Sequence, residues 1–341
     1  MLTNSASILS LVAPQTDGAF VALRDRSLRR PDGRIVAWAE VGPEDGHPIV
    51  SFPGTPTSRF AIRSDLRAYL DRDVRMIITE RPGFGASTRL PAHGFLEPAD
   101  DVAAILDELA VERAHLWGGS GGAPYLLAFA QRHGDRAVAA TIVSGSVQLA
   151  DDEIDDTIPM NAEFSRAALA GDVERLRSLA AVHREAILAD PLAGFRAVMD
   201  SAPEADRRVM ADAGWQIDLI TIARESLRQG VDGWVDELIA LRTRWDEITP
   251  ETNTIDITWW HGEADRNVPM TAARRFLARL PNARLVEFRE AGHLEAYRRN
   301  AEIFDELLAR PLPGYGQPQL RRAPTAGGAS AAAPSPAPRR R

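Results

Sequence analysis

The sequence predicts an α/β fold built around a mostly parallel sheet, and three observations carry this prediction. Short apolar segments, of the kind that form strands buried on both faces, alternate with helical segments along much of the chain. A glycine-rich turn with a serine at its apex joins one of these strands to a helix. Between residues 149 and 250 the strand-like segments stop and only helical ones continue, so we expect a helical insertion.

The strands are expected where the apolar segments occur. Two segments on either side of the turn signal Pro31-Asp32-Gly33 indicate an opening β-hairpin. Six further segments alternate with helices, as in the βαβ units of a parallel sheet. The eight expected strands are residues 24–30, 34–41, 48–52, 74–79, 114–117, 138–143, 255–260 and 284–288. The helices expected beside them are residues 58–70, 98–109, 123–133, 271–280 and 294–308.

The same patterns divide the chain into an extension, a core, a cap and a tail. Residues 1–22 carry no sustained period, residues 23–148 and 251–310 form the core, and residues 149–250 form an all-helical cap. Residues 311–341 are rich in proline, alanine and glycine, a composition that cannot pack a core, so we expect them to be disordered. The expected cap helices are residues 160–169, 173–188, 193–199, 205–227 and 234–245.

Composition excludes several chemistries. All 40 basic residues of the 341-residue chain are arginine, so no lysine is present for a phosphate-binding loop or a Schiff base. The chain has no cysteine, which excludes disulfides, thiolate zinc sites and cysteine nucleophiles.

The charge balance bears on partners. The net charge is −8, and it becomes −13 without the five arginines of the last 31 residues, because 35 basic residues then face 48 acidic ones. An acidic body argues against nucleic acid and against an anionic membrane as partners. No apolar stretch approaches the about 20 residues of a membrane span, and residues 1–13 lack a basic leader. We therefore expect a cytoplasmic protein that acts on a small molecule; its oligomeric state is left open.

The segment Gly118-Gly119-Ser120-Gly121-Gly122 has the pattern of a nucleophile elbow. A serine hydroxyl is a weak nucleophile unless the backbone presents it beside a base. Glycines two residues before and two after Ser120 leave room for neighbouring elements, and the sharp turn can hold the serine in a strained conformation. The N–H of Gly121 begins the following helix and is expected to face an oxyanion.

Two later residues are the expected partners of Ser120. Ligands bind outside the carboxyl ends of parallel strands, so an acid and a base should follow strands. Asp265 follows the strand at 255–260, and His293 follows the strand at 284–288. The order Ser, Asp, His along the chain suits an imidazole that is oriented by a carboxylate and takes a proton from a hydroxyl. His261 is expected to pack at a strand end, and the acidic residues at 151–156 indicate a solvated surface, so no metal is expected.

These features together resemble the α/β-hydrolase superfamily over about residues 24–308. The resemblance includes the elbow, the Arg-Pro-Gly-Phe-Gly-Ala-Ser turn at 81–87, the Gly-x-x-Asp-x-x-Val-Pro turn at 262–269, and the Gly-His pair at 292–293. It implies a mostly parallel, eight-stranded sheet with helices on both faces. It also implies a serine hydrolase that uses no metal or cofactor and cleaves an ester or related acyl bond through an acyl-enzyme.

The resemblance also implies an oxyanion hole. The loop Pro53-Gly54-Thr55-Pro56 stands where such enzymes place the first oxyanion donor, so the N–H groups of Thr55 and Gly121 are the expected pair. The superfamily usually has histidine at the position of Pro53. The oxyanion donors are backbone N–H groups, so proline in place of histidine does not remove them. The difference concerns how the loop is braced.

Several alternatives remain open from the sequence. Lactone, thioester, amide and carbon–carbon bond hydrolysis use the same triad, and a non-catalytic ligand receptor can keep the same scaffold. Epoxide hydrolases and haloalkane dehalogenases are disfavoured because their nucleophile is Asp, and a proline iminopeptidase is disfavoured because Gly121 stands where it has Trp. A dinucleotide oxidoreductase is disfavoured because neither Gly83-Phe84-Gly85 nor Gly119-Ser120-Gly121 completes the dinucleotide motif.

Apolar cap residues can line a substrate pocket or simply form the cap's own core: Ile158, Met160, Phe164, Phe195, Met199, Trp215, Ile217, Leu219 and Trp234.

Overall fold

The computed structural model describes residues 23–62, 67–193 and 202–315. The expected N-terminal extension at 1–22, the expected helix at 193–199 beyond its first residue, and the tail from residue 316 onwards lie outside these ranges. Within the described ranges, no helix is both long and apolar enough to cross a membrane.

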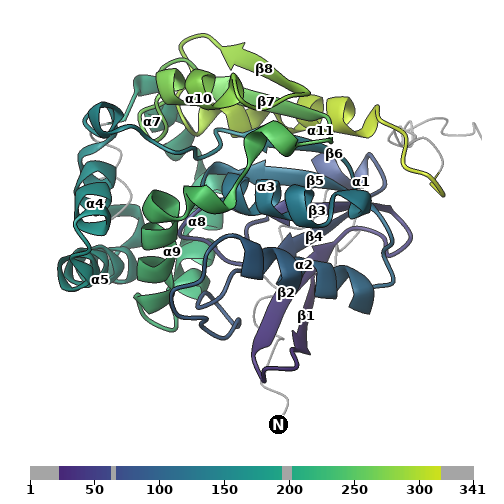
Figure 1. The fold of residues 1–341 in the computed structure, drawn as a ribbon, viewed down its shortest axis with the longest axis horizontal. Coiled ribbons are helices and arrows are strands. Elements are labelled where there is room, and N and C mark those ends of the chain that lie inside the picture. The colour runs from purple at the N-terminus through teal and green to yellow at the C-terminus, as the bar shows by residue number, and fades with distance from the viewer. Residues whose placement is uncertain (1–22, 63–66, 194–201, 316–341) are drawn as a thin grey trace, which may run out of the picture.

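Eight strands form one sheet in the order β1-β2-β4-β3-β5-β6-β7-β8. β1 and β2 form the predicted antiparallel hairpin, β2 also pairs antiparallel with β4, and the remaining neighbours are parallel. Figure 1 shows this sheet across the middle of the molecule. The predicted fold class is therefore confirmed. The strands are β1 (Arg24–Arg29), β2 (Ile35–Val41), β3 (His47–Phe52), β4 (Val74–Thr79), β5 (Ala114–Gly119), β6 (Ala137–Val143), β7 (Ile257–Gly262) and β8 (Ala283–Phe288).

The central strands are apolar because both of their faces are covered. Every residue of β3 and of β7 is buried, as expected for parallel strands between two helix layers. β1 is charged and largely exposed, as an edge strand should be. Parallel pairing brings the ends of β6, β7 and β8 together, because Val143 lies opposite Trp260 and Gly262 lies opposite Phe288. Loops that follow these strands therefore start from one edge of the sheet.

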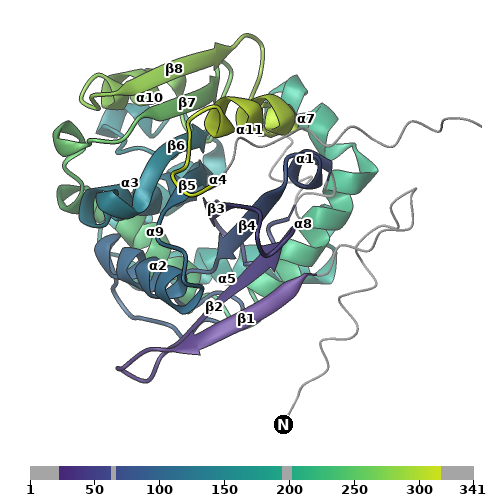
Figure 2. The same ribbon diagram turned by 90° about the vertical axis from the view of Figure 1, so that its right-hand side faces the viewer.

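Helices cover both faces of the sheet. Figure 2 shows α2 (Leu96–Glu108), α3 (Ala123–Arg132) and α10 (Met270–Leu277) on one side and α1 (Arg67–Leu70) and α11 (Asn300–Leu308) on the other. The two layers have separate apolar clusters, one containing residues of α2, α3 and α10 and one containing residues of α1 and α11.

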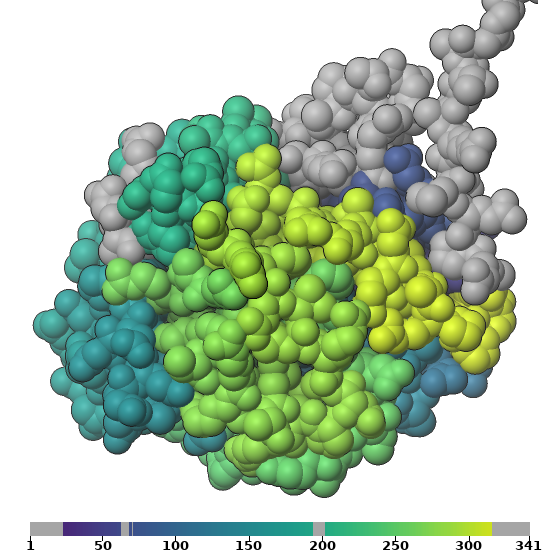
Figure 3. All heavy atoms as spheres, turned by 90° about the horizontal axis from the view of Figure 1, so that it is seen from above, coloured from purple at the N-terminus to yellow at the C-terminus, as the bar shows by residue number. Residues whose placement is uncertain are grey.

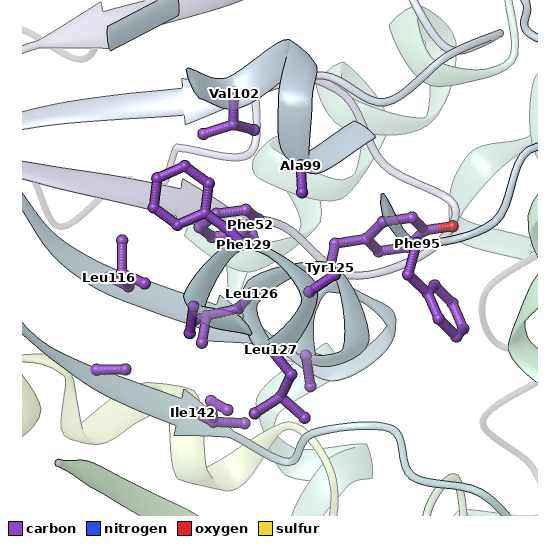
Figure 4. Packing of buried hydrophobic residues seen from close by; sticks show 14 of the residues in the cluster. Phe52, Phe95, Ala99, Val102, Leu116, Tyr125, Leu126, Leu127, Phe129 and Ile142 are labelled. Carbon is purple, nitrogen blue, oxygen red and sulfur yellow. The ribbon is translucent and has the colours of Figure 1, made fainter. Parts of the chain in front are cut away.

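The packing of α3 fixes the start of the helix that follows Ser120. Its Leu126 and Phe129 belong to the same buried cluster as Phe52 of β3, Leu116 of β5 and Ile142 of β6. Figure 4 shows these side chains gathered between α3 and the strands, and the rings of Phe52 and Phe129 lie 5.8 Å apart. Each such side chain stabilises the fold by about 1.5–3 kcal/mol when fully buried.

All the regular secondary structure in the described part of the chain between β6 and β7 is helical. These helices, which we call the cap helices, lie together at one end of the sheet in Figure 1. In the view of Figure 3 their teal segments border the yellow-green surface formed by the C-terminal part of the chain. The predicted limits of the cap at 149 and 250 stay a prediction. The cap helices are α4 (Pro159–Leu169), α5 (Val173–Ala189), α7 (Glu204–Met210), α8 (Ala213–Ser226) and α9 (Asp232–Thr243), with the short helices η4 (Asp151–Glu153), η5 (Trp245–Glu247) and η6 (Pro250–Thr252).

Some predicted elements differ from the structure. The helix expected over 205–227 is two helices, because the side chain of Asp212 accepts the N–H of Trp215 and starts α8 afresh. The helix expected from 294 begins as the short helix η7 (Glu295–Arg299) before α11. Residues 58–62 are not helical, since Ser58 closes a turn with its carbonyl and hydroxyl. The strand expected at 255–260 starts at residue 257, because the Asn253 amide donates to the carbonyl of Ile255.

Candidate active site

Ser120 lies at the apex of a sharp turn between β5 and α3. It begins a short helix, η2 (Ser120–Gly122), and it has a positive φ of 46°, a region that non-glycine residues rarely adopt. The sequence predicted this strained presentation of the hydroxyl.

The glycines around Ser120 are required by close packing. A Cβ at Gly122 would lie 1.9 Å from the carbonyl oxygen of Phe52, and a Cβ at Gly118 would lie 2.9 Å from a methyl of Leu126. The predicted reason for the two flanking glycines therefore holds, with the stronger constraint at Gly122.

The hydroxyl, an imidazole and a carboxylate lie in hydrogen-bonded succession. Ser120 Oγ is 2.9 Å from His293 Nε2, and His293 Nδ1 is 2.8 Å from Asp265 Oδ2. His293 and Asp265 are both buried, and both follow strands that end at the same edge of the sheet. The structure thus brings together the three side chains that were expected to meet.

The other oxygen of Asp265 is held by backbone. Oδ1 accepts the N–H groups of Asn267 and Val268 at 2.8 and 3.0 Å. His261 lies behind this carboxylate, with its Nε2 2.9 Å from the Val268 carbonyl and 3.4 Å from Asp265 Oδ2. Burial lowers the pKa of His261, so it is neutral near pH 7 and donates to the Val268 carbonyl. This position matches the packing role expected for His261.

Electrostatics favour a charged Asp265 beside His293. Burial by itself lowers the pKa of His293, but the carboxylates of Asp265 and Asp206 outweigh it, so the pKa of His293 lies above its ordinary value. Burial by itself raises the pKa of Asp265, and the charge and hydrogen bond of His293 outweigh it in turn, so the pKa of Asp265 is lowered. Asp265 therefore stays ionised at neutral pH, where its charge favours the protonated form of His293.

The loop that carries Thr55 packs directly on the elbow. A Cβ at Gly54 would lie 3.1 Å from Ser120 Cβ, and a Cβ at Gly121 would lie 3.3 Å from the Thr55 nitrogen. The Thr55 N–H donates to no described residue, and the Gly121 N–H lies in the first turn of η2, where helix geometry leaves such groups free. Two backbone donors thus stand beside Ser120.

An arginine and a glutamate brace this loop in place of the usual histidine. Arg81 donates from its two terminal nitrogens to the carbonyls of Pro53 and Gly54, each at 2.6 Å. Arg81 Nε and the Thr55 hydroxyl both hydrogen-bond to Glu237 of α9. Glu237 is fully buried, so a buried ion pair between Arg81 and the cap holds this loop.

A second cap carboxylate holds the segment that carries His293. Asp206 of α7 accepts the backbone N–H groups of His293 and Leu294, both at 2.8 Å. A Cβ at Gly292 would lie 2.3 Å from an oxygen of Asp206, which explains the glycine of the Gly-His pair. Burial raises the pKa of Asp206, although the positive charge on His293 opposes the shift.

A cavity of about 280 Å³ opens onto Ser120 and His293. Of the cap residues expected to line a pocket, four do so: Met160, Trp215, Leu219 and Trp234. Phe164 packs in the cap's own core and Ile217 is exposed. Ile158 is buried away from this cavity, and Phe195 and Met199 lie outside the described residues.

Sequence reasoning missed three residues that hold the site: Arg81, Glu237 and Asp206. Arg81 begins a recognised turn motif, which was a usable signal. Glu237 and Asp206 lie in cap helices crowded with acids, and nothing in the sequence separates them from solvated neighbours. In residues 23–62, 67–193 and 202–315 no three His, Asp or Glu side chains are grouped as a metal site requires.

Comparison with known proteins agrees with this architecture. A family model described as alpha/beta hydrolase fold matches residues 47–296. The 2-hydroxymuconate semialdehyde hydrolase of Pseudomonas putida is 27% identical over 263 residues, which cover 75% of this chain and 83% of that protein. The non-heme chloroperoxidase CPO-A1 of Kitasatospora aureofaciens is 25% identical over 272 residues, 77% of this chain and 90% of that protein.

Solved structures show the same fold. The esterase RhEst1 from Rhodococcus sp. ECU1013 superimposes with a TM-score of 0.55 at 19% identity, covering 84% of this chain and 99% of that chain. Est816, an N-acyl homoserine lactone degrading enzyme, gives a TM-score of 0.57 at 20% identity, covering 83% of this chain and 99% of that chain. At these identities the likeness concerns the fold alone.

Proposed function

Because this chain belongs to the α/β-hydrolase fold family, we propose that it is a serine hydrolase that cleaves an ester or a related acyl bond through an acyl-enzyme. The observation that carries this proposal is the hydrogen-bonded succession from Ser120 through His293 to Asp265. The expected compartment is the cytoplasm, as the composition suggested.

The proposed reaction begins with attack by Ser120 Oγ on the substrate's carbonyl carbon. His293 Nε2 takes the hydroxyl proton as the oxygen–carbon bond forms, and Asp265 stabilises the resulting imidazolium. When the bond to the leaving group breaks, His293 returns the proton to that group. Water then attacks the acyl-enzyme by the same route, with His293 as base, and releases the acid and free Ser120. The nucleophile and the base are both side chains, so these steps need no metal.

The negative oxygen of each tetrahedral intermediate is assigned to the N–H groups of Thr55 and Gly121. Their position beside Ser120 and the brace from Arg81 and Glu237 support this assignment. Rigid donors of this kind are effective because they need no reorganisation as charge develops, and each contributes about 10²- to 10³-fold in rate.

The substrate side of the cavity supports a small or medium-sized molecule with an apolar part. Tryptophan, methionine and leucine side chains of the cap line it together with Ser120, and apolar walls with few polar groups are typical of small-molecule sites. The relatives differ in the reactions their names state. Of the ester, lactone, thioester, amide and carbon–carbon bonds that such a triad can cleave, the screen described next tests the ester.

The test is a screen of p-nitrophenyl esters of increasing acyl length against the wild type and Ser120→Ala. We expect the wild type to hydrolyse at least one ester and Ser120→Ala to lose at least about 10⁴-fold in kcat, with an unchanged unfolding midpoint. Ser178→Ala, at an exposed serine of α5, is the matched control and should behave as the wild type. Activity retained in a folded Ser120→Ala protein would remove Ser120 from the reaction.

A further inference from the structure

Arg242 is a cation in the wall of the candidate active-site cavity. It lies near the end of α9 and lines the same cavity as Ser120 and His293. Its Nε donates to the hydroxyl of Ser165 at 2.7 Å, and one terminal nitrogen donates to the carbonyl of Leu241 at 3.2 Å. Both acceptors are neutral, so these bonds hold the guanidinium in place without neutralising it.

No described carboxylate pairs with Arg242, whereas Arg81 and Arg59, two other arginines of the core, have such partners. Arg81 pairs with Glu237, and Arg59 pairs with three acids. Burial lowers the pKa of Arg242 to about 10 because no nearby negative charge opposes it, so the side chain remains charged at neutral pH. Arg242 is half-buried. A cation held partly out of water without a counter-charge is costly to the fold, and such a cost is commonly met where a ligand supplies the missing charge.

A polar strip connects Arg242 with the candidate triad. The Ser165 hydroxyl that accepts from Arg242 donates to the carbonyl of Asn161 at 2.6 Å. The Asn161 amide donates to Asn267 Oδ1 at 3.1 Å, and the Asn267 N–H donates to Asp265. Asn161 and Asn267 line the cavity with Arg242, so one wall offers fixed polar groups while much of the remaining wall is apolar.

We propose that Arg242 binds a carboxylate of the substrate, held apart from the scissile acyl bond by an apolar spacer. This inference rests on the proposed function. The planar fork of a guanidinium fits a carboxylate, and the Asn161 side chain lies on the same wall to accept or donate a further hydrogen bond. The preferred substrates are then monoesters or related acyl derivatives of dicarboxylic acids rather than simple fatty acyl esters.

The test compares two p-nitrophenyl esters of equal length. One is the monoester of adipic acid, and the other has a primary amide in place of the free carboxylate. A hydrogen bond to a charged group contributes enough for about a 10- to 100-fold preference in kcat/KM for the carboxylate ester in the wild type. Arg242→Met should bring that ratio close to one, and Arg242→Lys should keep part of it. Comparing kcat/KM for the monoesters of glutaric and suberic acid then shows which spacer length the cavity prefers.

The matched control is Arg244→Met, which removes an exposed arginine two residues away and should leave the ratio unchanged. A wild type without the preference overturns the inference. An equal loss on both esters in Arg242→Met also overturns it, because that is the result of a purely structural role.

A binding measurement separates this inference from the proposed function. Calorimetry on Ser120→Ala with adipate and with adipamide needs no turnover. We expect adipate to bind at least about tenfold more tightly and the difference to vanish in Ser120→Ala/Arg242→Met. Ester hydrolysis without a preference for the charged substrate contradicts only the role of Arg242. Charge-selective binding by a protein that hydrolyses no ester contradicts only the proposed hydrolase activity.

Discussion

A single methyl group added at Gly121 should disable the candidate oxyanion hole. The Cβ of Gly121→Ala would lie 2.6 Å from Thr55 Cγ2, 3.0 Å from Thr55 Cβ and 3.3 Å from the Thr55 nitrogen. To reach the 3.4 Å of ordinary van der Waals contact, the methyl of Thr55 must retreat by about 0.8 Å. The backbone of Gly121 does not have a positive φ, so alanine adds this contact without backbone strain.

The expected loss follows from this displacement. A shift of about 1 Å in a positioning group can cost about 10²-fold, and removal of one oxyanion donor costs about 10²- to 10³-fold. We therefore expect Gly121→Ala to lower kcat by about 10²-fold on the best p-nitrophenyl ester, with a smaller change in KM. The assay is steady-state hydrolysis, with the unfolding midpoint measured in parallel.

A second substitution tests whether the contact with Thr55 causes the loss of kcat. Thr55→Ser removes the Cγ2 methyl that takes the closest contact and keeps the hydroxyl that bonds to Glu237. Thr55→Ser/Gly121→Ala should therefore recover at least about tenfold of the lost kcat, as a double-mutant cycle on contacting residues detects. Nearly full activity in folded Gly121→Ala, or no recovery on adding Thr55→Ser, would show that the contact between Gly121 and Thr55 does not set the position of the donors.

Two cap carboxylates give further predictions. Glu237→Gln leaves the buried Arg81 without its counter-charge, so the free energy of unfolding, measured by urea denaturation, should fall by about 3–5 kcal/mol. We also expect kcat to fall, because the loop that carries Thr55 is held less firmly. Unchanged stability would contradict the role of Glu237 in bracing this loop. Asp206→Asn removes a negative charge that raises the pKa of His293. Activity requires neutral His293 and is lost as pH falls through its pKa, so the acid limb of kcat/KM should move to lower pH in this variant, and a shift to higher pH would contradict the electrostatic assignment.

The sequence predicted the sheet well because the sheet follows from local patterns. Apolar strands and glycine-rich turns have strong local signals, and the hairpin at Gly33 and the elbow at Ser120 lie where they were expected. Boundaries were less certain where a side chain bonds to the backbone, as at Asp212, which restarts a helix, and at Asn253, which delays a strand.

The supports of the candidate site were harder to predict because they depend on long-range contacts. Glu237 and Arg81 are separated by 156 positions in the chain, and Asp206 and His293 by 87. Their residue types are ordinary for a surface helix, and only the folded cap makes them buried partners of the loop and of His293. The same holds for Arg242, because a chain with 48 acidic residues gives no sign that this arginine has no carboxylate partner among the described residues.

Labelling with a fluorophosphonate shows whether Ser120 is an activated nucleophile, because the probe reacts only with such a group. Intact-protein mass spectrometry and peptide mapping should find one phosphonyl group on Ser120 of the wild type, none on Ser120→Ala, and much slower labelling of His293→Gln. A folded wild-type protein that binds ligands yet carries no adduct on Ser120 would contradict the account and identify a ligand-binding protein on a hydrolase scaffold.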